Sequence, residues 1–325
     1  GCPQARVSGV VVNHDRQLRL DLDIKSSGAN RAWINTSPLR RTRELAGVLR
    51  TVLFAPEDLH LVRGDPGQRR NFLDELLVAQ RPGLAGVRAD YERVVRQRSA
   101  LLKSGMGNRR VDLSTLEVWD AHLAAHGSAL VAARLALIHE LAPHLAASYQ
   151  DIAPSSRPAS VGYVATSLDE LDAELLDPAR VPAPQDRETI EAALLAAMGR
   201  LRDRERDRGV CLVGPHRDEL TLLLGNDAAK THASHGESWS YALALRLSSF
   251  ELLRADGSDP VLMLDDVFAE LDRERRAALA AVALGAEQVL ITAAVAEDVP
   301  AELSAGVRRV VAEQGEHGRI SRIVD

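Results

Sequence analysis

The sequence has few of the residues that mark disulfide-stapled, zinc-binding or membrane-spanning proteins. Its 325 residues include two cysteines, Cys2 and Cys211, which lie far apart and have no Cys-x-x-Cys or Cys/His spacing. A disulfide framework and a zinc site therefore find no support. Because no apolar run approaches the roughly 18 residues of a membrane span and no basic-then-apolar leader is present, we expect a soluble, cytoplasmic protein without a membrane partner.

Lysine and aromatic residues are also scarce. Of the 40 basic residues only Lys25, Lys103 and Lys230 are lysines, and aromatic residues make up 3 % of the chain. None of these lysines follows a glycine, so the chain has no Gly-x-x-x-x-Gly-Lys phosphate-binding loop. The net charge of −6 argues against a surface coated in nucleic acid and leaves room for a local basic patch.

The beginning of the chain has the pattern of β-structure. Residues 17–24 alternate apolar and polar side chains, and the apolar stretch 10–12 precedes them across a turn-rich connection, which predicts an antiparallel hairpin. Short apolar runs at 32–34 and 52–54 predict two further strands.

From about residue 66 the apolar period becomes helical. Pro143 should kink or interrupt the second long helix after Ala142, because proline cannot donate the helical hydrogen bond. In order, the pattern predicts helices over 84–102 and 116–145 with a tip at 104–108 between them, a proline-rich loop region at 151–187 with a strand near 161–164, and a helix over 188–208 that ends at Gly209.

After Gly209 strands and helices alternate, which implies a parallel, buried sheet. The expected strands are 210–213, 219–224, 261–264 and 288–292, and the expected helices are 237–254 and 273–283. The fold class is therefore α/β. We expect a discontinuous head formed by residues 1–64 and 209–325, with a helical lobe, 65–208, inserted between its two parts.

Two carboxylates end the most apolar of the predicted strands. Four apolar residues, 261–264, precede Asp265 and Asp266, and ligands bind at the carboxyl edge of such sheets. In a nucleotide site Asp265 would hold Mg²⁺ and Asp266 would orient or deprotonate the attacking water. The alternative is a strand that stops at two solvated aspartates.

Two predicted helices begin with residues that suit either a cap or a ligand site. Ser234 and Glu237 have the spacing of a capping box, while the Ser234 hydroxyl, Gly236 and the free N–H groups of the helix start also form an anion site suited to a γ-phosphate. Asp272 precedes the other helix, where an N-cap is the commoner use of aspartate.

The order of these motifs resembles the ABC-type P-loop ATPase heads that also occur in SMC proteins, here with an antiparallel β portion and an inserted helical lobe. Within that class the chain resembles the RecF family of bacterial DNA replication and repair proteins. The resemblance rests on three stretches: Pro-Glu-Asp-Leu-His-Leu-Val-Arg-Gly-Asp-Pro at 56–66 with its continuation to residue 74, Gly-Pro-His-Arg-Asp at 214–218, and Met-Leu-Asp-Asp-Val-Phe-Ala-Glu-Leu-Asp-Arg-Glu-Arg at 263–275.

This resemblance implies a DNA-binding ATPase that uses ATP and Mg²⁺, dimerises around two nucleotides, and works with RecO and RecR on single-stranded and gapped duplex DNA in recombinational repair and the SOS response. It implies that Ser234, Gly236 and Glu237 contact the γ-phosphate held by the partner subunit, with Asp272 also at the nucleotide. Asp265 would be the metal residue. Asp266 would be catalytic where many relatives have Glu, which favours slow hydrolysis, and Thr292 would stand where transporters carry a histidine.

The sequence departs from this family in lacking the glycine-rich loop and its lysine. We therefore expect a chain that resembles a RecF protein without its N-terminal strand, P-loop and first helix, and that binds ATP weakly and lacks ATPase activity by itself. The alternative function is a catalytically inactive DNA-binding or scaffolding remnant of the same fold.

For DNA, the informative segment is 93–111, which has no acidic residue and lies at the predicted tip of the helical pair. Its basic side chains are guanidinium and ammonium groups without interleaved aromatics, so phosphate contact is expected and base stacking is not. The alternative is a solvated helix face in an arginine-rich protein. The predicted DNA-binding residues are Arg93, Arg96, Arg98, Lys103, Arg109 and Arg110, with a weaker cluster at Arg40, Arg41 and Arg43.

Overall fold

The computed structural model describes residues 2–13, 16–45, 47–105, 113–165, 181–257, 259–304, 306–315 and 318–324. Arg109 and Arg110, two of the residues predicted to bind DNA, lie outside these ranges.

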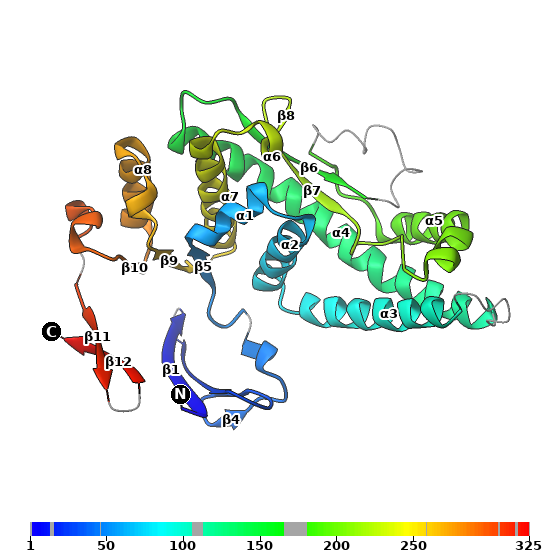
Figure 1. Cartoon of the computed structure of the whole chain (residues 1–325), viewed down its shortest axis with the longest axis horizontal. Helices are drawn as coiled ribbons and strands as arrows, with labels where there is room; N and C mark the ends of the chain where they lie inside the picture. The colour runs from blue at the N-terminus through cyan, green and yellow to red at the C-terminus, as the bar shows by residue number, and fades with distance from the viewer. Residues whose placement is uncertain are drawn as a thin grey trace.

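A parallel three-stranded sheet joins the two ends of the chain (Figure 1). β5 (Thr51–Phe54) pairs with β9 (Val261–Asp265), and β9 pairs with β10 (Val289–Thr292). One face of the sheet packs into the core through buried Phe54, Leu262 and Leu264. A strand from the first part of the chain thus lies beside strands from the last part, as a head formed by both ends of the chain requires.

The first four strands form a separate antiparallel sheet, seen at the bottom of Figure 1. β1 (Gln4–Asn13) and β2 (Arg16–Lys25) make a hairpin, followed by β3 (Arg31–Ile34) and the short β4 (Ser37–Pro38). The period-2 pattern at 17–24 thus predicted this hairpin correctly. A 3-10 turn, Thr42–Leu45, leads from this sheet toward β5.

The inserted part of the chain is a long helical lobe. α2 (Pro66–Gln80) and α3 (Leu84–Ser104) precede α4 (Leu113–Ile152), and α5 (Arg187–Arg208) returns along it. α4 packs against α2, α3, α5 and α7 (His235–Ala255). A second antiparallel sheet, β6 (Ala159–Val164), β7 (Glu219–Leu224) and β8 (Asp227–Ala228), links the lobe to the head, since β6 pairs with β7 across 55 or more residues of sequence.

The remaining elements surround the two ends of the chain. In order they are the 3-10 turn Pro56–Asp58, α1 (Leu59–Arg63), α6 (Ala229–His232), the 3-10 turn Phe268–Glu270, α8 (Arg273–Gly285), the 3-10 turns Ala296–Asp298 and Ala301–Leu303, and the hairpin β11 (Arg309–Gly315) with β12 (Gly318–Val324). α1 and α7 lie together beside β5, as Figure 1 shows.

Helix α4 corrects one prediction. It runs without interruption past Pro143 to Ile152, so the interruption does not occur, which was one of the two effects predicted for the proline beside a kink. Leu141, Leu145 and Tyr149 on either side of the proline are all buried, so their packing outweighs the one lost backbone bond. Within the described residues α4 is the one helix long and apolar enough to span a membrane, and more than half of its most apolar window is buried inside the molecule, as in a core helix of a globular protein.

The expected strand 210–213 is also wrong. Gly209 ends α5 in the left-handed conformation, with φ of 63°. Residues 210–213, which follow it, have no regular secondary structure. The backbone N–H of Leu212 donates to Glu205 Oε1 at 2.6 Å and the carbonyl of Cys211 accepts from Arg217 at 2.8 Å. These backbone groups therefore bond to side chains and not to a neighbouring strand. An apolar run of four residues has the same sequence pattern in an irregular, partly buried segment as in a strand.

Candidate functional site

Asp265 and Asp266 lie at the carboxyl edge of the parallel sheet, as the sequence predicted. The side chain of Thr292, at the end of β10, donates a hydrogen bond to Asp265 Oδ1. The backbone N–H of Asp266 donates to the carbonyl oxygen and to Oγ1 of Thr292, both at 3.1 Å. Both aspartates are exposed. Thr292, at the position singled out for its lack of a histidine, thus fixes the geometry of this carboxylate pair.

Asp266 has an uncommon backbone conformation, with φ of 52°. Aspartate tolerates this left-handed region better than most residues because its short polar side chain bonds locally. The turn directs the chain away from the sheet immediately after β9, so that Asp266 sits at the edge and not in a continued strand. Among the described residues, no group of three or more His, Cys, Asp or Glu side chains is arranged to hold a metal ion.

The start of α7 has the predicted capping box. The backbone N–H of Glu237 donates to Ser234 Oγ at 3.2 Å, and the N–H of Ser234 donates to Glu237 Oε2 at 2.8 Å. The Ser234 hydroxyl that accepts this bond keeps its own proton for donation to a ligand. The cap and the anion site therefore use the same residues without excluding one another.

The Glu237 carboxylate is held on both sides. Its Oε1 accepts from Ser156 Oγ and from Arg157 Nη2, both at 3.3 Å. The hydrogen bond from the Ser234 backbone, aided by Arg157, lowers the pKa of Glu237. An ionised Glu237 that is already paired serves to fix the start of α7 and to lock it to the segment after α4, since Tyr149 of α4 bonds to the same Ser156.

Asp272 is the N-cap of α8. Its Oδ1 accepts from the backbone N–H of Arg275 at 3.0 Å, and its Oδ2 pairs with Arg275 Nη1 at 2.5 Å. The same guanidinium group lies against Gly236. The structure thus brings the start of α7 and the start of α8 together through one arginine.

The basic segment of α3 divides into exposed and buried residues. Arg93 and Arg96 keep 63 % and 69 % of their side chains exposed and pair with Asp90 and Glu92 on the preceding turn. Such surface pairs are weak, so both guanidinium groups can turn to a phosphate. Lys103 is exposed as well.

Arg98 was predicted to bind DNA, and the structure removes it from that set. Its side chain is fully buried and forms ion pairs with Asp120 of α4 at 2.7 Å and Glu205 of α5 at 2.6 Å. A charge buried between two carboxylates has its hydrogen-bonding capacity used inside the protein. Arg98 is therefore a structural link between three helices, and Cys211 accepts from it as well.

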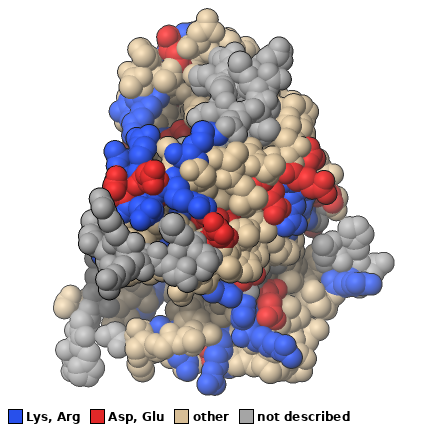
Figure 2. Space-filling view, turned by 90° about the vertical axis from the view of Figure 1, so that its right-hand side faces the viewer, with Lys and Arg blue, Asp and Glu red and all other residues tan. Residues whose placement is uncertain are grey.

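Sequence reasoning missed a second basic stripe on the neighbouring helix. Arg200, Arg204 and Arg208 recur every four residues on α5 and are exposed. The Arg98–Glu205 pair places this helix directly beside α3. Figure 2 looks onto this end of the molecule, where blue side chains gather among red ones. The i, i+4, i+8 spacing was the available signal, and the alternating acids of α5 obscured it.

The comparisons with known proteins settle the family. No protein-family model matches the chain. It is 59 % identical over 333 residues to the DNA replication and repair protein RecF of Rhodococcus erythropolis (strain PR4 / NBRC 100887), a match that covers 100 % of this chain and 81 % of that protein. The chain belongs to the RecF family.

Two solved RecF structures share its fold. A structure of the recombination mediator protein RecF-ATPrS in the RecFOR pathway matches with a TM-score of 0.81, 22 % identity, and coverage of 95 % of this chain and 78 % of that one. A structure of RecF-ATP in the same pathway matches with a TM-score of 0.79, 23 % identity, and coverage of 91 % and 76 %. The α/β ATPase-head fold expected from the sequence is confirmed.

The Gly-Pro-His-Arg-Asp motif of this RecF family member ties the lobe to the head. Gly214 has φ of 122°, and a Cβ there would lie 2.5 Å from the hydroxyl of Tyr91, so only glycine fits. The Tyr91 hydroxyl lies 2.6 Å from His216 Nδ1. Burial, opposed by the Cys211 carbonyl and reinforced by nearby arginines, lowers the pKa of His216 to about 4.

Beside this motif lies a buried polar network centred on Arg134 of α4. Its guanidinium pairs with Asp74 of α2 and donates to the Pro215 carbonyl at 2.8 Å and to the Tyr163 hydroxyl at 3.1 Å. The Tyr163 hydroxyl donates in turn to Asp218 at 2.8 Å. Each of these charges has a partner, so the network fixes the relative positions of α2, α4, β6 and the motif.

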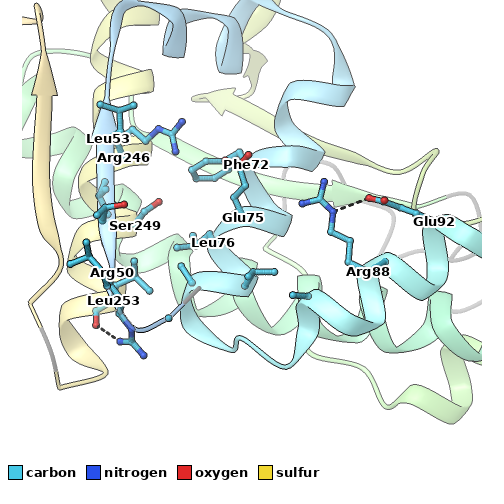
Figure 3. Close-up of a pocket in the computed structure, with 18 residues that line it drawn as sticks. Arg50, Leu53, Phe72, Glu75, Leu76, Arg88, Glu92, Arg246, Ser249 and Leu253 are labelled. Carbon is cyan, nitrogen blue, oxygen red and sulfur yellow. Dashed lines mark hydrogen bonds and ion pairs between the residues drawn. The ribbon is translucent and has the colours of Figure 1, made fainter. Parts of the chain in front are cut away.

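A cavity of about 620 Å³ lies between β5, α2, α3 and α7 (Figure 3). Its arginines are paired within the protein: Arg50 with Asp256, Arg88 with Glu92, and Arg246 with Asp58 while stacked over Phe72. No residue predicted to bind nucleotide or DNA lines this cavity. It is a gap between the sheet and the lobe, separate from the sheet edge at Asp265.

Proposed function

We propose that this RecF family member is an ATP-dependent DNA-binding protein of recombinational repair and the SOS response, with ATPase chemistry at the edge of its head. Its substrates are single-stranded and gapped duplex DNA, and its partners are RecO and RecR. The 59 % relative is named for DNA replication and repair, and the solved RecF structures carry ATP or ATPrS and are assigned to the RecFOR pathway. Such a protein works in the cytoplasm.

The observation that carries this proposal is the pair of anion- and cation-binding elements on one head. The start of α7 offers the Ser234 hydroxyl and free N–H groups as donors for a phosphate. Gly236 has no side chain that would keep a phosphate away from this backbone. The exposed carboxylate of Asp265 fits a hydrated Mg²⁺, which is commonly held by one or two carboxylates plus phosphate oxygens. Bound ATP would supply the phosphate anion and the bond whose cleavage resets the protein.

Each residue has a distinct role in this proposal. Asp265, oriented by Thr292, holds the metal, and Asp266 orients the attacking water. Ser234, Gly236 and Glu237 complete the site of the partner subunit, Glu237 by fixing the helix start, and Asp272 positions the adjoining loop. A homodimer that forms only with nucleotide follows from this arrangement.

The DNA surface is the exposed stripe of α3, Arg93, Arg96 and Lys103, which belongs with Arg109 and Arg110 of the connecting segment. The stripe on α5 extends it. Phosphate contacts by such side chains bind DNA without reading its sequence.

Dimer formation tests this function in a protein that joins this chain to the family's N-terminal strand, glycine-rich loop and first helix, here called the full-length protein. Ser234→Arg should abolish dimerisation with ATPγS while the monomer still binds nucleotide, because a bulky cation blocks the phosphate site and leaves the metal edge intact. Sedimentation velocity with ATPγS measures the dimer, and Ser8→Arg on the N-terminal sheet is the matched control. Equal dimer formation by wild type and Ser234→Arg contradicts the proposal.

The alternative, a catalytically inactive scaffold, is less favoured because the close relative aligns with the whole chain and because the carboxylate edge and the α7 cap are both intact. Retention of DNA binding without any response to nucleotide in the full-length protein would support that alternative.

A further inference from the structure

Arg275, in the first turn of α8, contacts two elements at once. Its backbone N–H and its Nη1 atom both bond to Asp272, at 3.0 and 2.5 Å. On the other side its guanidinium lies against α7: a Cβ added to Gly236 would be 3.2 Å from both Nη1 and Nη2. A methyl group at position 236 would therefore require this guanidinium to shift by a few tenths of an ångström.

The contact places a positive charge where α7 already carries one. The first turn of a helix has unpaired N–H groups and the positive end of its dipole, and a guanidinium beside it is unfavourable unless an anion is near. Asp272 provides one such charge. The Nε atom of Arg275 is buried and has no hydrogen-bond partner among the described residues, so its hydrogen-bonding capacity is not exhausted.

The neighbouring arginines do not have this arrangement. Arg157 is paired with both Asp227 and Glu237, so its charge is balanced within the cap itself. Arg63 donates to the neutral Ser238 hydroxyl one turn further along α7. Arg275 alone of the three also bonds to the N-cap residue of α8, which follows the Asp265–Asp266 strand in the chain.

We propose that Arg275 binds the terminal phosphate of a nucleoside triphosphate that docks at the start of α7. It holds the α7 start and Asp272 as one unit, so that the phosphate of the partner's nucleotide is met by the Ser234 hydroxyl, the helix N–H groups and a guanidinium. This role rests on the proposed function, since it assumes that the phosphate comes from the partner subunit.

Dimerisation of the full-length protein with ATPγS is the first test. Arg275→Ala should raise the ATPγS concentration for half-maximal dimer formation about tenfold or more, the loss expected for one charge-assisted contact, with nucleotide binding by the monomer unchanged. Arg275→Lys, which keeps the charge and loses the planar fork, should lie between. Arg273→Ala removes an equal charge from an exposed position on the same turn and should match wild type.

Mixed dimers show on which side of the site Arg275 acts. Combined with Asp265→Asn, whose nucleotide binding is expected to be weakened, Arg275→Ala should restore one complete site and therefore ATPγS-dependent dimers, because each subunit supplies what the other lacks. Combined with Ser234→Arg it should restore none, since both lesions lie on the α7 side. Restoration by Ser234→Arg and not by Asp265→Asn would overturn the proposal, as would Arg275→Ala behaving like Arg273→Ala.

Gly236→Ala disturbs the same contact between residue 236 and Arg275 from the α7 side. It can replace Arg275→Ala in these tests if Arg275→Ala does not fold. Its methyl group displaces the guanidinium without removing the charge, so it should raise the half-maximal ATPγS concentration and show the same pattern in mixed dimers. The opposite pattern contradicts the role of Arg275. Absence of nucleotide-dependent dimers in wild type would instead contradict the proposed function, so the two failures are distinguishable.

Discussion

At the scale of single residues, Asp265 and Asp266 are neighbours with different surroundings. Asp265 accepts a hydrogen bond from the Thr292 side chain, whereas the backbone of Asp266 is anchored to Thr292 and its carboxylate projects from a left-handed turn. A carboxylate fixed by a hydroxyl donor suits a metal ion. The carboxylate that follows the left-handed turn suits a water molecule.

The two aspartates should therefore separate in function in the full-length protein. Asp265→Asn should weaken Mg²⁺-dependent nucleotide binding about tenfold or more, because a metal-binding charge is lost. Asp266→Asn should bind nucleotide normally and accumulate the ATP-bound dimer, with single-turnover hydrolysis reduced about 100-fold. Equilibrium binding and rapid-quench kinetics on both variants measure this. Identical defects would mean that the carboxylates share one role.

Arg98 should matter for folding and not for DNA. Arg98→Met leaves Asp120 and Glu205 buried without their common cation, which should reduce the free energy of unfolding by about 3–5 kcal/mol. The exposed Arg96→Met, two residues away, should change it by about 0.5 kcal/mol or less. Urea denaturation compares the two. Equal stabilities would contradict the structural role assigned to Arg98.

At the scale of helices and strands, features that depend on nearby residues could be predicted from the sequence, and features that depend on distant residues could not. The α7 capping box, the Asp272 cap and the left-handed Gly209 were all foreseen, because each depends on residues within five positions of one another. The irregular conformation of residues 210–213 and the continuity of α4 were not predicted. Their conformations are decided by Arg217, Glu205 and the packed core, which periodicity alone does not reveal.

The exposed faces of α3 and α5 give an electrostatic prediction. Replacing Arg93 and Arg96 with Ala should flatten the slope of log K for DNA against log salt by about 0.7–0.9 per lost phosphate contact. Fluorescence anisotropy from 50 to 300 mM salt measures the slope. The double variant Arg16→Ala with Arg322→Ala removes two exposed arginines elsewhere and should leave the slope unchanged. Equal slopes for all three proteins would make the α3 stripe a solvated face.

At the scale of the whole molecule, the junction between lobe and head contains a titratable group. Burial lowers the pKa of His216 to about 4 from an ordinary value of 6.5. Between these pH values His216 is protonated in the unfolded chain and neutral in the folded chain. Its contribution to the free energy of unfolding is therefore full above pH 6.5 and is lost as the pH falls toward 4.

Wild-type stability should fall across that window by on the order of 2–3 kcal/mol more than the stability of His216→Gln, which cannot take up the proton. Denaturation curves at intervals between pH 7 and 4 measure the difference, and carboxylates that titrate in both proteins cancel. Parallel curves for the two proteins would show that His216 is protonated as readily in the folded state as in the unfolded one.

The sequence by itself determined the elements and the chemistry of their ends: the hairpin from its period of two, the helices from their apolar stripes, the carboxylates that end β9, and the caps of α7 and α8. Each of these depends on residues that are close in the chain. Only the tertiary structure decided that Arg98 is buried, that α5 lies beside α3, and that Arg275 lies against Gly236. Those contacts join residues 39 to 113 positions apart or depend on how whole helices pack. The burial that sets their energy exists only after the chain has folded.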